Sequence, residues 1–78
     1  SARVFNVTSA LTGAQASLSV ACTRVDYLEV VVDGRGQGSH DVVNDAAQIT
    51  VAANAGSRME LRGYLGTGEH VCTRRWTL

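Results

Sequence analysis

Short runs of alternating apolar and polar residues recur along the chain, and this pattern constrains the fold more than any other feature. The clearest run is Tyr27–Val32, in which Leu28, Val30 and Val32 fall on one face at the two-residue period of a β-strand. Its consecutive β-branched valines favour an extended chain, because a helix restricts their χ1 rotamers. The run leads directly into the glycine-rich segment Asp33–Gly38, which we predict to be a flexible, exposed hairpin tip.

Similar runs occur on both sides of this segment, about ten residues apart and separated by turn signals. The expected strands are residues 3–8, 16–22, 27–32, 40–43, 48–52, 59–65 and 69–78. The chain contains no proline and no helical period of useful length. We therefore predict an all-β fold: a small antiparallel β-sandwich, immunoglobulin-like or Greek-key, of six to seven strands, in a single domain that covers residues 1–78.

The composition excludes several functional classes. The 78 residues are 45% apolar and 18% charged, as in a globular domain near the lower size limit for an independent core. Seven basic and seven acidic residues give zero net charge, which argues against nucleic-acid binding because that needs clustered positive charge. No apolar run approaches the roughly 18 residues of a membrane-spanning helix. The lack of such a run predicts no membrane insertion. The chain begins Ser-Ala-Arg without Met, so we expect a mature or trimmed product.

Cys22 and Cys72 are the only cysteines, one in each half of the chain. Two cysteines are compatible with two free thiols, half of a metal site or one disulfide. The chain has no C-x-x-C spacing, and its only histidines are His40 and His70, so we expect no zinc site. We expect a disulfide, which would stabilise so small a domain by about 4 kcal/mol in the chain-entropy model. A disulfide implies a secreted or extracellular location.

The chain offers little for catalysis. A nucleophile would need an adjacent base that a third group orients, and only His40 and His70 are histidines that could act as that base. A domain this small also has little concave volume for a water-excluding active site. Asp33, Asp41 and Asp45 do not have the spacing of a calcium-binding loop. We therefore predict no enzymatic activity, no catalytic residues, no metal site and no cofactor.

Two places in the sequence are candidates for partner binding. Arg35 lies between two glycines at the expected hairpin tip, where it could pair with a carboxylate of a partner. Arg74, Arg75 and Trp76 are consecutive in the last expected strand, and Trp and Arg are enriched in interface hot spots. Alternatively, Arg35 is an ordinary solvated turn residue, and Trp76 packs in the core near the disulfide.

The last expected strand has an irregular pattern. If the strand is regular, Cys72, Arg74 and Trp76 share one face, which places an arginine between two apolar side chains. A β-bulge near Arg74 and Arg75 would remove this conflict by shifting the register by one residue, and we prefer this interpretation. Alternatively, Arg74 lies at the rim of the sheet and its aliphatic stem covers apolar surface.

Three segments, Val30–Gly34, Gln48–Thr50 and Gly63–Val71, resemble parts of the small secreted bacterial α-amylase inhibitors of the tendamistat type. They include a strand that runs into Asp-Gly and a Gly-Tyr turn before the last strand. The resemblance covers about half of the chain and implies a six-stranded sandwich of similar size. That family has two disulfides and an inhibitory Trp-Arg-Tyr tripeptide, whereas this chain has two cysteines and lacks the tripeptide. No inhibitory residue is therefore carried over.

These observations together predict a secreted module that binds a protein partner, with hydrolase inhibition as one form of that activity. The alternative is a structural or adhesive module, such as a surface-layer, phage-particle or carbohydrate-binding domain. The expected partner is a protein, with carbohydrate as a second option and nucleic acid excluded. The expected partner-binding residues are Arg35, Arg74, Arg75 and Trp76.

Overall fold

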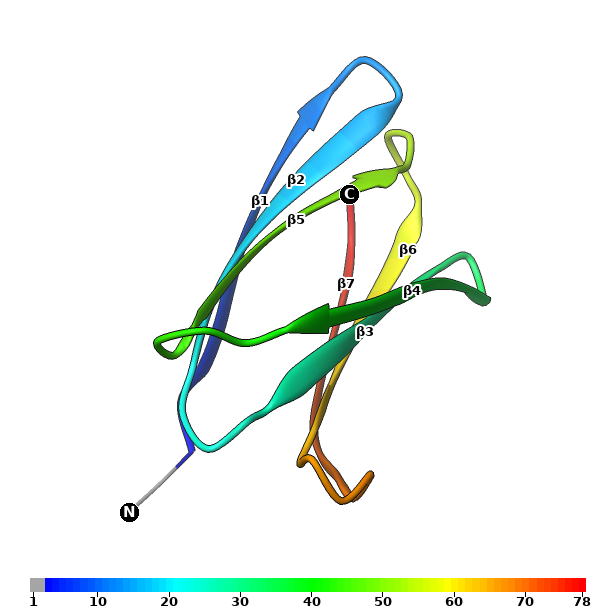
Figure 1. The fold of residues 1–78 in the computed structure, drawn as a ribbon. Coiled ribbons are helices and arrows are strands. Elements are labelled where there is room, and N and C mark those ends of the chain that lie inside the picture. Colours follow the sequence, from blue (N-terminus) through cyan, green and yellow to red (C-terminus); the bar gives the residue numbers. More distant parts are fainter. Residues whose placement is uncertain (1–2) are drawn as a thin grey trace.

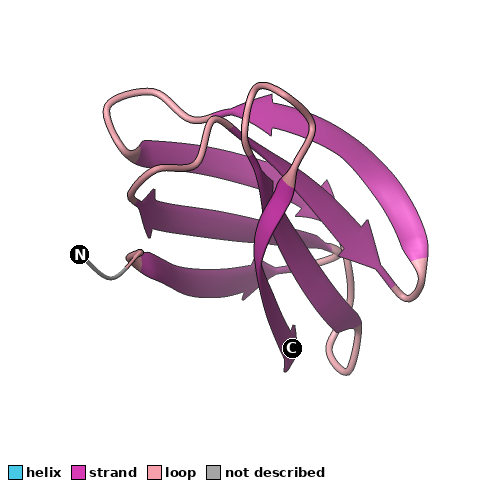
Figure 2. Ribbon diagram, turned by 90° about the horizontal axis from the view of Figure 1, so that it is seen from below, coloured by secondary structure: helices cyan, strands magenta, loops and turns pink. Residues whose placement is uncertain are grey.

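The computed structural model of the protein describes residues 3–78, which form seven β-strands and contain no helix. No helix among the described residues is therefore long and apolar enough to span a lipid bilayer. Figure 2 shows strands joined by loops throughout this part of the chain. The strands are β1 (Phe5–Thr12), β2 (Gln15–Cys22), β3 (Tyr27–Val32), β4 (Arg35–Asp41), β5 (Ala46–Ala52), β6 (Arg58–Tyr64) and β7 (His70–Thr77). The predicted all-β fold is confirmed.

The strands form two antiparallel sheets that enclose the core between them (Figure 1). The three-stranded sheet has the order β1-β2-β5, and the four-stranded sheet has the order β4-β3-β6-β7. If the strands are lettered A to G, then A, B and E share one sheet and C, F and G share the other, as in an immunoglobulin constant domain. The fourth strand differs, because here it pairs with the third strand instead of the fifth.

The core is built from alternate residues of the central strands. In β2, β3 and β5 every second residue is buried, which is the pattern of a strand with one face toward the core. Leu28, Val30 and Val32 are all buried, as predicted for the strand that they define. The largest fully buried side chains are Leu18, Cys22, Leu28, Val30 and Leu61.

The segment that follows β3 differs from the prediction. The turn consists only of Asp33 and Gly34, whose φ angles of 50° and 81° are those of a type I′ hairpin turn. β4 begins directly afterwards at Arg35, and a register shift in its ladder with β3 accommodates Gly38, whose φ is 97°. The predicted flexible tip and the short strand at residues 40–43 were therefore wrong, because glycines that suggest a loop also fit a bulged edge strand.

The last strand contains a bulge, but not at the predicted position. The ladder between β6 and β7 shifts register between Gly63 and Tyr64 and is regular from Cys72 onward. Arg74 and Trp76 therefore share the face that carries Cys72. The bulge predicted at positions 74–75 is wrong. Arg74 is tolerated on this face because β7 is an edge strand, where its side chain is exposed at the rim.

Candidate functional site

The outer face of the four-stranded sheet contains a hollow beside the β3–β4 turn. Its volume is about 480 Å³, and it is open to solvent. The residues that line it are Val31, Gly34, Arg58, Met59, Glu60, Arg75, Trp76 and Thr77.

Cross-strand pairing explains why the charged residues of the hollow lie together. Val31 pairs with Glu60, and Glu60 pairs with Arg75, so the three form one row across β3, β6 and β7. They alternate along their strands with residues of the core face, and the row therefore points away from the core. Arg58 pairs with Thr77 in the next row of the same face. Arg58 and Arg75 are thus diagonal neighbours, with Cα atoms about 7–8 Å apart.

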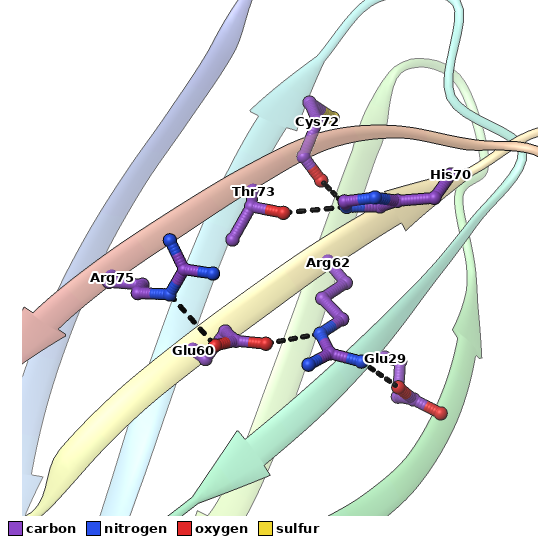
Figure 3. A network of polar contacts seen from close by, with 7 residues as sticks. All are labelled: Glu29, Glu60, Arg62, His70, Cys72, Thr73 and Arg75. Carbon is purple, nitrogen blue, oxygen red and sulfur yellow. Dashed lines mark hydrogen bonds and ion pairs between the residues drawn. The ribbon is translucent and has the colours of Figure 1, made fainter.

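Glu60 links two arginines in this face (Figure 3). One carboxylate oxygen accepts a hydrogen bond from Nε of Arg75 at 2.9 Å, and the other accepts one from Nε of Arg62. Nη1 of Arg62 lies 3.7 Å from Oε1 of Glu29, so the network spans β3, β6 and β7. The Glu60 side chain is only 17% exposed, whereas that of Arg75 is 72% exposed. The mostly buried carboxylate of Glu60 therefore holds Arg75, whose side chain is largely exposed to solvent.

The charges of this network are fixed by its hydrogen bonds. The bonds from Arg62 and then from Arg75 lower the pKa of Glu60, because they favour its ionised form. The bond to Glu60 and a second one to Tyr64 raise the pKa of Arg62. The Glu60 carboxylate is consequently ionised at neutral pH, and the arginine that it anchors is presented as a cation.

Arg58 is a site residue that the sequence interpretation missed. Its side chain is 78% exposed, and its Nε lies 3.6 Å from Oδ1 of Asp33. Its backbone N–H donates to the same oxygen at 2.9 Å, and this bond is the main reason why the pKa of Asp33 is lowered. The signal was available, since Arg58, Glu60 and Arg62 occupy alternate positions of one strand and must share a face.

The structure brings together only some of the predicted partner-binding residues. Arg75 and Trp76 both line the hollow, whereas Arg74 lies on the opposite face of β7 because adjacent residues of a strand alternate. Arg35 is the exposed first residue of β4 and follows Gly34, but it is not part of the lining. Arg75 is therefore the only arginine of the predicted set that contributes to the hollow.

Trp76 has a mainly structural environment. It pairs with Met59 on the inner side of the sheet, is partly buried and packs against the core, as the alternative interpretation predicted. Its Nε1–H is buried and has no acceptor among the described residues. An unsatisfied buried donor costs about 1–3 kcal/mol. Trp76 thus supports the β7 side of the hollow more than it presents a surface to a partner.

The two cysteines are free in the structure, so the predicted disulfide is not formed in it. Both point toward the interior, where Cys22 is buried and Cys72 packs against the core. Burial raises the pKa of Cys22, and the charge of the Cys72 thiolate would raise it further. Burial also raises the pKa of Cys72. Both thiols are consequently protonated at neutral pH, which makes them poor nucleophiles.

His70 lies in a cluster of polar and aromatic side chains at the start of β7. Nε2 of His70 lies 3.0 Å from the carbonyl oxygen of Cys72 and 2.6 Å from Oγ1 of Thr73 (Figure 3). Because a carbonyl oxygen only accepts, Nε2 carries the hydrogen. The His70 ring also lies 5.3 Å from that of Tyr64, which stacks on Tyr27 at 5.1 Å. These rings form an aromatic cluster at the far end of the same sheet face.

Comparisons with known proteins do not identify the site. No protein-family model, no curated protein and no solved structure matches the chain. Among residues 3–78, no group of three or more His, Cys, Asp and Glu side chains is placed to hold a metal ion. The function therefore has to be inferred from the chemistry of the hollow itself.

Proposed function

We propose that the protein is a binding module that captures a protein partner through the hollow on the outer face of the four-stranded sheet. One observation carries the proposal: the exposed Arg58 and Arg75 lie on the neighbouring strands β6 and β7, and the apolar Val31 of β3 lines the same hollow. The guanidinium group matches a carboxylate through two parallel hydrogen bonds, and arginine is enriched in interface hot spots. The partner that fits is a protein segment with an acidic side chain next to an apolar one.

The anchoring of Arg75 favours this use. Its contact to Glu60 is made by Nε, which is the nitrogen nearest the strand (Figure 3), so a partner's carboxylate would meet the terminal nitrogens. Immobilising a flexible side chain on binding costs about 0.5–1.5 kcal/mol, and an arginine that is already held avoids part of this cost. The pairing of β7 with β6 also restricts the backbone of Arg75.

Secretion and a disulfide are part of the same proposal. Gly63 leaves room for the Sγ atom of Cys72 beside the core, and Cys22 is buried on the facing sheet. Oxidation of this pair in a secretory compartment would join β2 to β7 and would suit a domain of this size. Alkylation without reductant followed by mass measurement tests it: an unmodified chain is expected, and two alkylated cysteines would contradict it.

The binding proposal is tested by capturing partners from the culture medium of the source organism with the immobilised domain. We expect a one-to-one complex, and Arg75→Ala should raise its dissociation constant by about tenfold or more, as for a hot-spot arginine. Arg74→Ala is the matched control, because it removes the same charge from the next residue of the strand but on the opposite face. Equal losses for both variants, or no loss for Arg75→Ala, would contradict the proposal.

A second candidate is a structural or adhesive module, and one observation favours it: no strand of the three-stranded sheet contains a charged residue. Uncharged sheet edges permit self-association. A module of this kind should assemble into long polymers and should capture no soluble partner. Light scattering of the purified chain, measured beside the capture experiment, distinguishes the two candidates.

A further inference from the structure

Charge is distributed very unevenly over the two sheets. The chain has seven basic and seven acidic residues, and all of them lie outside β1, β2 and β5. The outer face of the three-stranded sheet consists of Asn, Thr, Ser, Gln and Ala side chains, and all of these residues are exposed. Soluble proteins ordinarily protect exposed edge strands with charges, prolines or bulges. The three-stranded sheet lacks the charges, and the whole chain lacks proline.

The edges of the four-stranded sheet do have such protection. β4 carries Arg35 and Asp41, β7 carries Arg74 and Arg75, and the ladder of each with its neighbour contains a register shift. The ladders of the three-stranded sheet are continuous instead, over eight residue pairs between β1 and β2 and seven between β2 and β5. The contrast shows that β1 and β5 are the two unprotected edges of the molecule.

β1 is the more open of the two edges. From Thr8 onward every residue of β1 is exposed. This includes Ser9 and Leu11, which lie on the same face of the strand as the partly buried Phe5 and Val7. Leu11 is 38% exposed in this stretch. Figure 1 shows that the β1–β2 hairpin extends beyond the other strands at the top of the view. The second half of β1 therefore extends beyond the core, and the four-stranded sheet does not cover it.

The direction of the free backbone groups follows from the ladder. The N–H of Thr23 donates to the carbonyl of Val4 at 3.0 Å, which continues the β1–β2 register by one pair. Hydrogen-bonded and non-hydrogen-bonded pairs alternate in an antiparallel ladder, so the even-numbered residues of β1 bond to β2. Val7, Ser9 and Leu11 consequently direct their N–H and C=O groups away from β2, toward the free edge.

We infer that β1 pairs with β1 of a second copy of this chain, antiparallel, around a two-fold axis at Ser9. In this register Ser9 lies opposite Ser9 of the second copy, and Val7 lies opposite its Leu11. Both pairs join residues whose free backbone groups point to the edge, and the paired side chains lie on the same face. The exposed Leu11 thereby gains an apolar neighbour, and the two three-stranded sheets become one continuous sheet.

Charge favours a second copy as the occupant, and the small contact area predicts a weak dimer. The uncharged edge meets an identical uncharged edge, and the zero net charge of the chain produces no long-range repulsion between copies. An eight-residue strand is about 27 Å long, and adding one strand buries less than the roughly 800 Å² per partner of a stable interface. The dimer should therefore be weak and concentration-dependent. The two-fold axis closes the assembly at two copies.

Sedimentation velocity over a dilution series tests the inference with the whole chain. The unmodified protein should form dimers at high concentration and dissociate on dilution. Ser9→Pro removes only an outward-facing N–H, which edge strands tolerate, and it should raise the dissociation constant about tenfold or more because the central pair loses both hydrogen bonds. Leu11→Arg places a charge on the edge and should weaken the dimer without any change to the backbone.

Thr50→Pro is the matched control on the other edge of the same sheet. The N–H of Cys22 donates to the carbonyl of Asp45 at 2.9 Å, so the even-numbered residues of β5, including Thr50, face outward. This variant should dimerise like the unmodified protein.

Monomers at every concentration, or unchanged dimers of both Ser9→Pro and Leu11→Arg, would overturn the inference. Loss of dimers in Thr50→Pro as well as Ser9→Pro would indicate β1–β5 pairing and would overturn the two-fold register. The dimer is independent of the proposed function, because Arg75 lies on the other sheet.

Discussion

Gly63 lies where two strands and a loop meet inside the sandwich. It pairs with Cys72 across β6 and β7, and Val25 from the β2–β3 connection packs against the same point. A Cβ atom at Gly63 would clash with Sγ of Cys72 and would lie 3.1 Å from Cγ1 of Val25. The absence of a side chain is therefore what lets Cys72 turn toward the core.

Gly63→Ala should destabilise the protein by about 1–3 kcal/mol, which is the usual cost of forcing an extra methyl group into a packed interior. Urea denaturation measures this loss. Gly36→Ala is the control, because Gly36 lies in β4 and a Cβ there would meet no atom within 4 Å. If both variants unfold at the same urea concentration, the space beside Gly63 is not filled as the structure indicates.

At the level of the elements, the Glu29–Arg62–Glu60–Arg75 network ties the outer faces of three strands together. Each of two neighbouring rows pairs one carboxylate with one guanidinium group, Glu29 with Arg62 and Glu60 with Arg75, so each charge has an opposite charge on a neighbouring strand. Glu60 is the centre because it bonds to two arginines.

The lowered pKa of Glu60 predicts an acid-sensitive contribution to stability. A carboxyl group whose pKa is lower in the folded state stabilises the fold above its unfolded pKa, about 4.3, and loses that contribution as the pH falls through the folded value. Glu60→Gln should therefore unfold more readily than the unmodified protein at pH 7, and the difference should shrink in acid. A difference in unfolding free energy that is constant down to about pH 3 would contradict this.

Strands with a regular pattern were predictable from the sequence, whereas the extent of the edge strand β4 was not. β2, β3, β5 and β6 bury alternate side chains, so their periodicity alone indicated them. β4 has two glycines, several polar residues and no buried side chain. It forms because it pairs with β3, and its own sequence has little strand propensity. The bulge of β7 also depends on the register with β6, which no local pattern specifies.

In the candidate site as well, local sequence signals identified some residues, whereas others could be placed only from the pairing of strands. Arg75 was a predicted binding residue, because adjacent Arg and Trp residues are a local signal. Separating Arg75 from Arg74 required only the strand period, once the strand was known to be regular. Placing Arg58 beside Arg75 required the β6–β7 pairing, which joins residues far apart in the sequence. Non-local register is thus the information that the sequence interpretation lacked.

At the scale of the whole molecule, the two sheets differ in charge and therefore in the contacts that they favour. The four-stranded sheet presents an ion-pair network and two exposed arginines, which suits the recognition of an acidic partner. The three-stranded sheet is uncharged with free edges, which suits pairing with a like strand. The central claim is that each sheet has its own binding surface.

Amide NMR spectra of the protein test this claim most directly, recorded over a dilution series and then with a captured partner. Dilution should shift only amides of β1, strongest at Val7, Ser9 and Leu11, which face the free edge. The partner should shift only amides around the hollow, including those of Glu60 and Arg75. Dilution-dependent shifts in β4 or β7, or partner-dependent shifts in β1, would contradict the claim.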